Sequence, residues 1–218
     1  MSNAARLYTP AEAGVVSGLK LKAVHNAIDK RIVTPAGGVK RAAPRLLTGE
    51  DLVRLRVWRG VGAALSTERR HRLFTAIAAK PTARTVKADE LLIVDVGEAR
   101  RQVGRGVRDL EAAEAMVARD KATLGGEPVF KGTRIPVHGV AAMLDAGASA
   151  EDILSGYPRL TGRMLDLARI WVAAHPRRGR PKSLGDLGLT VKSAKRAPLK
   201  PDPLAGRIRA AAAGGRTS

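Results

Sequence analysis

The sequence of 218 residues contains no cysteine, and aromatic residues make up only 3% of it. The absence of cysteine excludes disulfide bonds, thiolate metal ligands and cysteine nucleophiles. Two residues each of Phe, Tyr and Trp are too few for a protein that binds single-stranded nucleic acid by stacking bases on aromatic rings. The core is therefore expected to consist of Ala, Val, Leu and Ile, a composition that suits small helical domains.

Long hydrophobic runs are also missing. No stretch approaches 18 consecutive apolar residues, and the first residues lack the apolar segment of a signal peptide. We therefore expect no membrane-spanning helix and no contact with a membrane, and we expect the protein to be cytoplasmic.

The signatures of enzymes are missing as well. The four histidines are each isolated in the sequence, without the paired spacing of metal ligands: they are His25, His71, His138 and His175. There is no glycine-rich phosphate-binding loop, and the fragment Gly104-Arg105-Gly106 falls within a predicted helix rather than after a strand. The sequence therefore predicts no catalytic residue, no metal site and no cofactor, and we do not expect an enzyme.

Positive charge, by contrast, is abundant. The chain has 39 Lys and Arg against 20 Asp and Glu, a formal net charge of +19. A surplus of this size attracts polyanions, of which nucleic acid is the commonest. The charge favours a nucleic-acid-binding protein, with a ribosomal-type or merely soluble basic protein as the alternative.

Residues 6–79 have the pattern of a winged helix-turn-helix domain. Thr9 and Pro10 predict the start of a helix over residues 10–16. A tight turn at Gly18 follows, and apolar residues at helical spacing predict a second helix over residues 20–30. Two short helices joined by a glycine-containing turn are typical of a helix-turn-helix unit.

The rest of this region predicts a β-wing and two further helices. Two apolar runs flank a basic, glycine-rich loop within residues 31–47, which indicates a wing. Helices are predicted over residues 48–60, where Thr48 is the expected cap, and over residues 66–79.

The second helix and the wing supply the predicted DNA-binding surface. The Asn26 side chain could read adenine through a pair of hydrogen bonds, and the lysines would mostly contact phosphate. The alternative is a solvated basic face on a helix that packs against a partner protein. The predicted DNA-binding residues are Lys20, Lys22, His25, Asn26 and Lys30 in the helix, and Lys40, Arg41 and Arg45 in the wing.

Residues 80–118 are predicted to be a connector or a dimerisation element. A short β-branched run at residues 91–96 indicates a strand, and a helix is expected over residues 98–118. Gly104 and Gly106 weaken the helical prediction. Nothing in this region points to chemistry.

Residues 119–175 predict a second helix-turn-helix-like domain. Helices are expected over residues 138–145, 149–155 and 161–174, with Ser149 and Thr161 as caps of the last two.

A motif of Gly, Thr, Arg, Ile and Pro precedes these helices. Gly132 permits a turn, and Pro136 fixes an extended entry into the first helix. Lys131 and Arg134 either contact DNA or another subunit, or form internal salt bridges to Glu127 or Asp152; the sequence leaves both open.

Two resemblances add to this interpretation. Residues 8–60 resemble a winged helix-turn-helix of the MerR/excisionase type, in the segment from Tyr8 to Ala13, in Ser17-Gly18-Leu19 and in the following helix. Residues 120–172 resemble a bacterial family of formerly unknown function, whose members are often described as VapB-type antitoxins with a helix-turn-helix-like fold. This second resemblance is carried by the Gly-Gly-Glu-Pro-Val-Phe-Lys-Gly-Thr-Arg-Ile-Pro-Val pattern, whose motif residues include Gly126, Pro128, Gly132, Thr133, Arg134 and Pro136.

The second resemblance implies a PIN-like ribonuclease toxin as partner. Residues 176–218, a tail with eleven Lys and Arg against two Asp, are expected to be disordered when free. Such a tail could fold onto the toxin, or its Arg178-Gly179-Arg180-Pro181 segment could lie in a DNA minor groove as an AT-hook does. The candidate residues for either role are Arg177, Arg178, Arg180, Lys182, Leu184 and Leu187.

The sequence thus predicts a mainly α-helical protein with two helix-turn-helix-like domains, the N-terminal one winged, small β elements and a disordered basic tail. We expect an antitoxin, acting as a homodimer, that neutralises a PIN-like ribonuclease and represses its own operon by binding DNA. The alternatives are a stand-alone DNA-binding transcriptional regulator without a toxin partner, and a non-specific nucleoid or RNA-associated basic protein.

Overall fold

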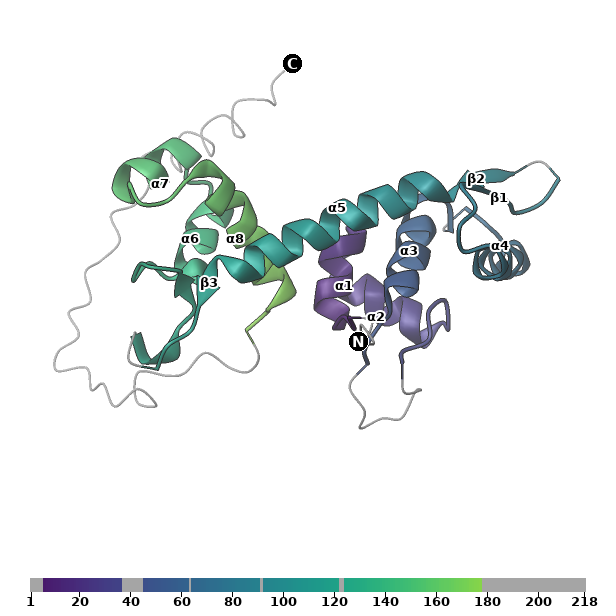
Figure 1. Cartoon of the computed structure of the whole chain (residues 1–218), viewed down its shortest axis with the longest axis horizontal. Coiled ribbons are helices and arrows are strands. Elements are labelled where there is room, and N and C mark those ends of the chain that lie inside the picture. Colours follow the sequence, from purple (N-terminus) through teal and green to yellow (C-terminus); the bar gives the residue numbers. More distant parts are fainter. Residues whose placement is uncertain (1–5, 37–44, 63, 91, 122–123, 178–218) are drawn as a thin grey trace, which may run out of the picture. The chain divides into compact units, whose positions relative to one another are not determined.

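A computed structural model describes residues 6–36, 45–62, 64–90, 92–121 and 124–177. The chain is mainly helical with two small antiparallel sheets, as Figure 1 shows, so the predicted fold class is confirmed at this level. In the part of the chain that the structure describes, no helix has the length and apolar character needed to cross a membrane.

The first two helices follow the caps in the sequence. Helix α1 (Pro10–Ser17) begins with a capping box, in which the Glu12 carboxylate accepts the Thr9 N–H at 2.6 Å and the Thr9 hydroxyl accepts the Glu12 N–H. It ends at Gly18, whose φ of 73° is the left-handed conformation that favours glycine. Helix α2 (Leu21–Asp29) follows after two residues and packs on α1.

Among the described residues, the segment predicted to form the wing contains isolated β-bridges but no β-strand. The Ala36 N–H donates to Leu46, while Leu47 pairs with Tyr8 through two backbone hydrogen bonds of 2.8 Å. Leu47 is thus held by the segment that precedes α1, so only an isolated bridge remains between the two runs expected to form the wing. The loop at residues 37–44 lies outside the described residues.

The next two helices also start at predicted caps. Helix α3 (Gly49–Val57) has a capping box between Thr48 and Asp51, and it continues as a π-helical turn, η1 (Trp58–Gly62). Helix α4 (Thr67–Ala79) starts at the Ser66 cap.

The first sheet is a short hairpin. Strand β1 (Thr85–Lys87) pairs with β2 (Ile93–Asp95), and the buried Val86 and Val94 face each other in the register. The predicted strand at residues 91–96 is therefore present but shorter, and its partner β1 was not predicted, because three residues carry too little pattern to be recognised.

Helix α5 (Val96–Ala115) is the longest of the described helices, and it passes α1 and α3 before it reaches α8 (Figure 1). The prediction that Gly104 and Gly106 weaken this helix misses the packing role of Gly106. A Cβ atom on Gly106 would lie 2.9 Å from the Val16 carbonyl oxygen and 3.1 Å from Val16 Cα. Glycine at this position therefore lets the backbones of α1 and α5 approach closely.

The last part of the described chain contains a second small sheet and three helices. Strand β3 (Val117–Ala118) pairs with β4 (Val129–Phe130), so the helix predicted to reach residue 118 ends at Ala115 instead. A 3₁₀ turn, η2 (Leu124–Gly126), lies between the two strands. Helices α6 (Val137–Asp145), α7 (Ala150–Gly156) and α8 (Gly162–Ala174) start within a residue of their predicted positions, and Ser149 and Thr161 cap α7 and α8.

Two hydrophobic clusters form the interior. The first lies among α1 to α4, the β1–β2 hairpin and α5, and the second lies among β4, α6, α7 and α8. Helix α5 contributes Leu110 to the first cluster and Ala113 to the second, and Ile170 of α8 packs against both. Residues up to Arg177 accordingly form one unit by their contacts.

The close approach at Gly106 predicts opposite effects for two substitutions in the same helix. Gly106→Ala forces a methyl group against the backbone of Val16 and should lower the free energy of unfolding by about 1–3 kcal/mol. Gly104→Ala, whose Cβ would meet only the Arg108 guanidinium at 3.7 Å, should raise it by about 0.5–1 kcal/mol because alanine favours the helix. Urea unfolding followed by circular dichroism measures both, and equal effects of the two substitutions would contradict the packing role of Gly106.

Candidate nucleic-acid interface

Helix α2 has one buried face and one polar face. Val24, Ala27 and Ile28 are buried against the first hydrophobic cluster. On the opposite side Lys22, Asn26 and Lys30 are exposed, and their spacing of four residues places them on one face of the helix. Lys20 is exposed at the N-cap position, and His25 is half-buried. The structure thus brings together the predicted residues of this helix, with His25 partly withdrawn from solvent.

The beginning of α2 lacks the usual acidic compensation. Its N-cap residue is Lys20, which makes no side-chain capping bond, and no acidic residue lies in its first turn. By comparison, α1, α3, α4, α5 and α7 each have an acid there, whereas α6 and α8, like α2, have none. Because the N–H groups at a helix start carry partial positive charge, α2 presents an uncompensated positive end to an anion.

Two arginines that were not among the predicted DNA-binding residues lie next to the turn between α1 and α2. The Arg56 guanidinium donates to the Ser17 carbonyl at 3.3 Å, and it also donates to the Gln102 side chain on α5. The Arg59 guanidinium occupies the space that a Cβ atom on Gly18 would need. Burial, followed by the charge of Arg59, lowers the pKa of Arg56, although an arginine stays protonated at neutral pH. Arg56 lies on α3 and Arg59 on η1, and only tertiary packing brings these segments to the turn, so no local signal indicated the two cations.

The predicted wing residues are only partly described. The Arg45 guanidinium forms an ion pair with Asp29 at 3.0 Å, beside the end of α2. Asp29 is exposed and Arg45 is half-buried, so solvent screens the pair and it contributes little to stability. Lys40 and Arg41 lie outside the described residues.

Hydrogen bonds within the segment hold the loop between β4 and α6. Gly132 has a φ of 75°, and the Thr133 hydroxyl donates to the Phe130 carbonyl and accepts the Ile135 N–H. Pro136 forms an isolated β-bridge with Val129 and occupies the N-cap position of α6 in an extended conformation. This arrangement confirms the structural roles predicted for Gly132 and Pro136.

The two cations of that loop remain exposed. Neither Lys131 nor Arg134 forms an ion pair within the described ranges. Glu127 instead pairs with Arg177 at 2.6 Å, and the Asp152 carboxylate accepts the Ser149 hydroxyl. The internal salt bridges proposed as one alternative are therefore not formed.

The motif residues before this loop lie in the turn that leads into β4. Gly126 has a φ of 87°, and the Pro128 carbonyl accepts the Val137 N–H at 3.0 Å. Of the predicted tail residues, Arg177 is described and exposed. The others, Arg178, Arg180, Lys182, Leu184 and Leu187, lie outside the described residues.

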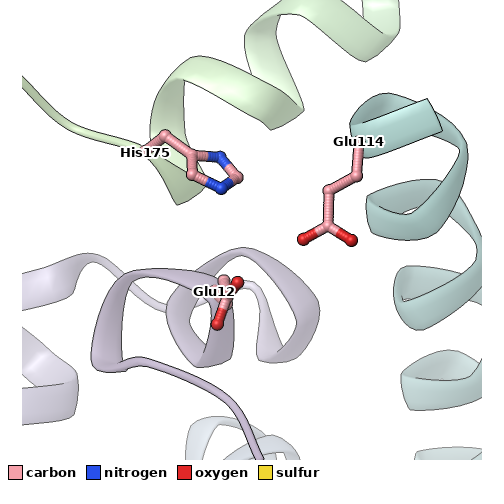
Figure 2. A group of neighbouring side chains, drawn as sticks. All are labelled: Glu12, Glu114 and His175. Carbon is pink, nitrogen blue, oxygen red and sulfur yellow. The ribbon is translucent and has the colours of Figure 1, made fainter. Parts of the chain in front are cut away.

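A separate polar cluster joins three segments that are distant in the sequence. Glu12 of α1, Glu114 of α5 and His175 after α8 each offer a ligand atom, and these atoms lie within 4.8 Å of one another (Figure 2). Arg6 lies beside the two carboxylates, donating to Glu114 at 2.7 Å and lying 3.7 Å from Glu12. His175 is isolated in the sequence, and only the packing of α1, α5 and α8 brings it beside Glu12 and Glu114.

Two histidines flank the buried Trp171 of α8. The His175 ring stacks on the indole with centroids 4.7 Å apart, and the His138 ring meets it edge-on at 5.3 Å. Burial, followed by the charge of Arg177, lowers the pKa of His138.

These features define a mainly helical, strongly basic protein in which a helix pair presents one cationic, polar face. The chain belongs to the same family as the "Uncharacterized protein y4eO" of Sinorhizobium fredii (strain NBRC 101917 / NGR234). The two are 32% identical over 198 residues, which cover 86% of this chain and 90% of the relative. Residues 117–170 match the family described as "Protein of unknown function (DUF433)". This match overlaps residues 120–172, whose motif resembles a family of formerly unknown function.

A comparison with solved structures gives one further similarity. The X-ray crystal structure of Rv2018 from Mycobacterium tuberculosis has a TM-score of 0.30 to this chain and 16% sequence identity. The similarity covers 77% of this chain and 97% of the other.

The environment of His138 predicts a loss of stability in weak acid. The folded-state pKa of His138 is lowered, so as the pH falls the unfolded chain takes up this proton first. The free energy of unfolding should therefore fall as the pH drops through about 6.5, and this contribution should level off below the folded pKa. Urea unfolding between about pH 7.5 and pH 5 should show a shallower fall for His138→Gln than for the unaltered chain, and identical slopes would contradict this assignment.

Proposed function

We propose that this protein is a DNA-binding regulator in which α1 and α2 act as a helix-turn-helix unit of the MerR/excisionase type. The observation that carries the proposal is the polar face of α2, where Lys22, Asn26 and Lys30 are exposed opposite a buried apolar face. An amide between two lysines matches base reading flanked by phosphate contacts.

Charge around the turn supports the same proposal. The start of α2 carries Lys20 and no acid in its first turn, and Arg56 and Arg59 lie beside Ser17 and Gly18 in the turn that precedes it. A DNA phosphate at this point would meet helix N–H groups and three cations. The net charge of +19 would add long-range attraction to any polyanion.

We further propose that the regulator is an antitoxin that neutralises a PIN-like ribonuclease and represses the operon it shares with that toxin. This part rests on the resemblance of residues 120–172 to VapB-type antitoxins. Arginines of the tail, residues 176–218, would pair with the carboxylates that hold the divalent cation of such a ribonuclease. A homodimer would match a two-fold symmetric operator.

Substitutions on α2 test the DNA-binding part. In fluorescence anisotropy with DNA from upstream of the gene, Asn26→Ala should weaken specific binding by about 1–3 kcal/mol and reduce discrimination against unrelated DNA. Lys22→Ala should weaken binding to both DNAs and reduce the slope of log K against log salt by about 0.9. Lys80→Ala, which removes an exposed lysine at the end of α4, serves as the matched control.

The outcome separates the alternatives. Equal affinity for operator and unrelated DNA in the unaltered chain would favour a non-specific nucleoid or RNA-associated protein. An effect of Lys80→Ala as large as that of Lys22→Ala would show that the net charge, and not the α2 face, binds DNA.

Co-expression with the adjacent gene tests the antitoxin part. If the neighbour is a toxin, the full chain should restore growth and co-purify with it, whereas a chain that ends at residue 175 should do neither. Rescue by both chains would keep the antitoxin proposal and exclude the tail as the inhibitory segment. A harmless neighbour that does not co-purify would leave a stand-alone regulator.

A further inference from the structure

We propose that Glu12, Glu114 and His175 form a binding site for one divalent transition-metal ion of the Zn²⁺ type. The three side chains are half-buried, and one ligand atom from each lies within 4.8 Å of the others. They come from the first turn of α1, the end of α5 and the residue after α8 (Figure 2). The proposal is independent of DNA binding and of any toxin.

The imidazole of His175 is already held in the form that a metal requires. Its Nδ1 lies 3.0 Å from the Trp171 carbonyl oxygen, which can only accept a hydrogen bond, so the proton lies on Nδ1. The ring is also fixed by stacking on Trp171 with an interplanar angle of 17°. The lone pair is therefore on Nε2, and Figure 2 shows this nitrogen on the side of the ring that faces Glu12 and Glu114. A backbone carbonyl that orients the other ring nitrogen is a recurrent partner of metal-binding histidines.

The two carboxylates need a cation at this position. The Glu12 side chain is 13% exposed and the Glu114 side chain 31% exposed, so solvent screens their mutual repulsion only in part. Arg6 supplies that cation through its 2.7 Å hydrogen bond to Glu114, which is the main cause of the raised pKa of Arg6. A divalent ion could take its place, because each carboxylate has a second oxygen and Arg6 could move to Glu111, already 3.9 Å away.

The donor set determines the class of ion. One imidazole nitrogen and two carboxylate oxygens, with no thiolate, suit Zn²⁺ and its neighbours Co²⁺ and Ni²⁺. Bonds of about 2.0–2.2 Å to a tetrahedral ion place its ligands about 3.4 Å apart. Ligand atoms that now lie within 4.8 Å of one another would therefore have to approach by at most about 1.4 Å. Three protein ligands leave a fourth position for water or an external ligand.

Titration of the full chain, first freed of metal with a chelator, tests the site. Calorimetry with Zn²⁺ and visible absorption with Co²⁺ should show one saturable equivalent. His175→Ala and Glu114→Gln should each weaken that binding by more than the roughly 10–100-fold that loss of an outer hydrogen-bond partner costs. His71→Ala, which removes an exposed histidine on α4, should leave it unchanged.

Arg6→Ala distinguishes a metal site from a simple network of ion pairs. Removing the competing guanidinium should strengthen Zn²⁺ binding severalfold, although it removes an ion pair from the folded protein. Circular dichroism before each titration shows which variants fold. If His175→Ala does not fold, Glu114→Gln still tests the site. The proposal is overturned if no saturable equivalent binds, if folded His175→Ala or Glu114→Gln binds as tightly as the unaltered chain, or if Arg6→Ala leaves the affinity unchanged.

Discussion

The close packing of α5 against α1 is the constraint on which most of this structure depends. At Gly106 the backbones of the two helices approach so closely that even a methyl group would clash with Val16. Helix α5 also reaches the second hydrophobic cluster through Ala113 and packs on α8. It therefore connects the cluster around α1 with the cluster around α8. A single glycine in the middle of a twenty-residue helix therefore sets how closely α5 packs on α1.

The same contact organises both polar features of the molecule. On one side of Gly106, Gln102 of α5 accepts from Arg56, which in turn donates to Ser17 at the end of α1. On the other side, Glu114 of α5 comes beside Glu12 at the start of α1. The turn that precedes α2 and the Glu12–Glu114–His175 cluster are thus braced by two ends of one helix. A shift of α5 along α1 would disturb both of them.

The sequence predicted the elements whose signals are local. Thr9, Thr48, Ser149 and Thr161 all cap helices as expected, because a cap needs only neighbouring residues. The pairing of β3 with β4 was missed, since strands of two residues have no periodicity, and the helix was extended across β3 as a result. Gly106 was interpreted as a weak point, because a close approach between helices is invisible in one helix alone. On α2 the exposed face was predicted from its period, whereas Arg56, Arg59 and the Glu12–Glu114–His175 cluster depend on tertiary packing.

The start of α2 combines the lack of an acid, which α6 and α8 share, with a lysine at its N-cap position. Acidic side chains occupy the first turns of α1, α3, α4, α5 and α7, where they compensate the helix dipole, and several also pair with arginines. Helix α2 begins with a lysine and has its own acid, Asp29, only at its last residue, where Arg45 pairs with it. No acidic side chain in the first turn of α2 therefore compensates the positive end of its dipole or the charge of Lys20. An anion would gain more there than at any of the five helix starts that an acid already occupies, which is the physical basis for expecting a phosphate at this turn.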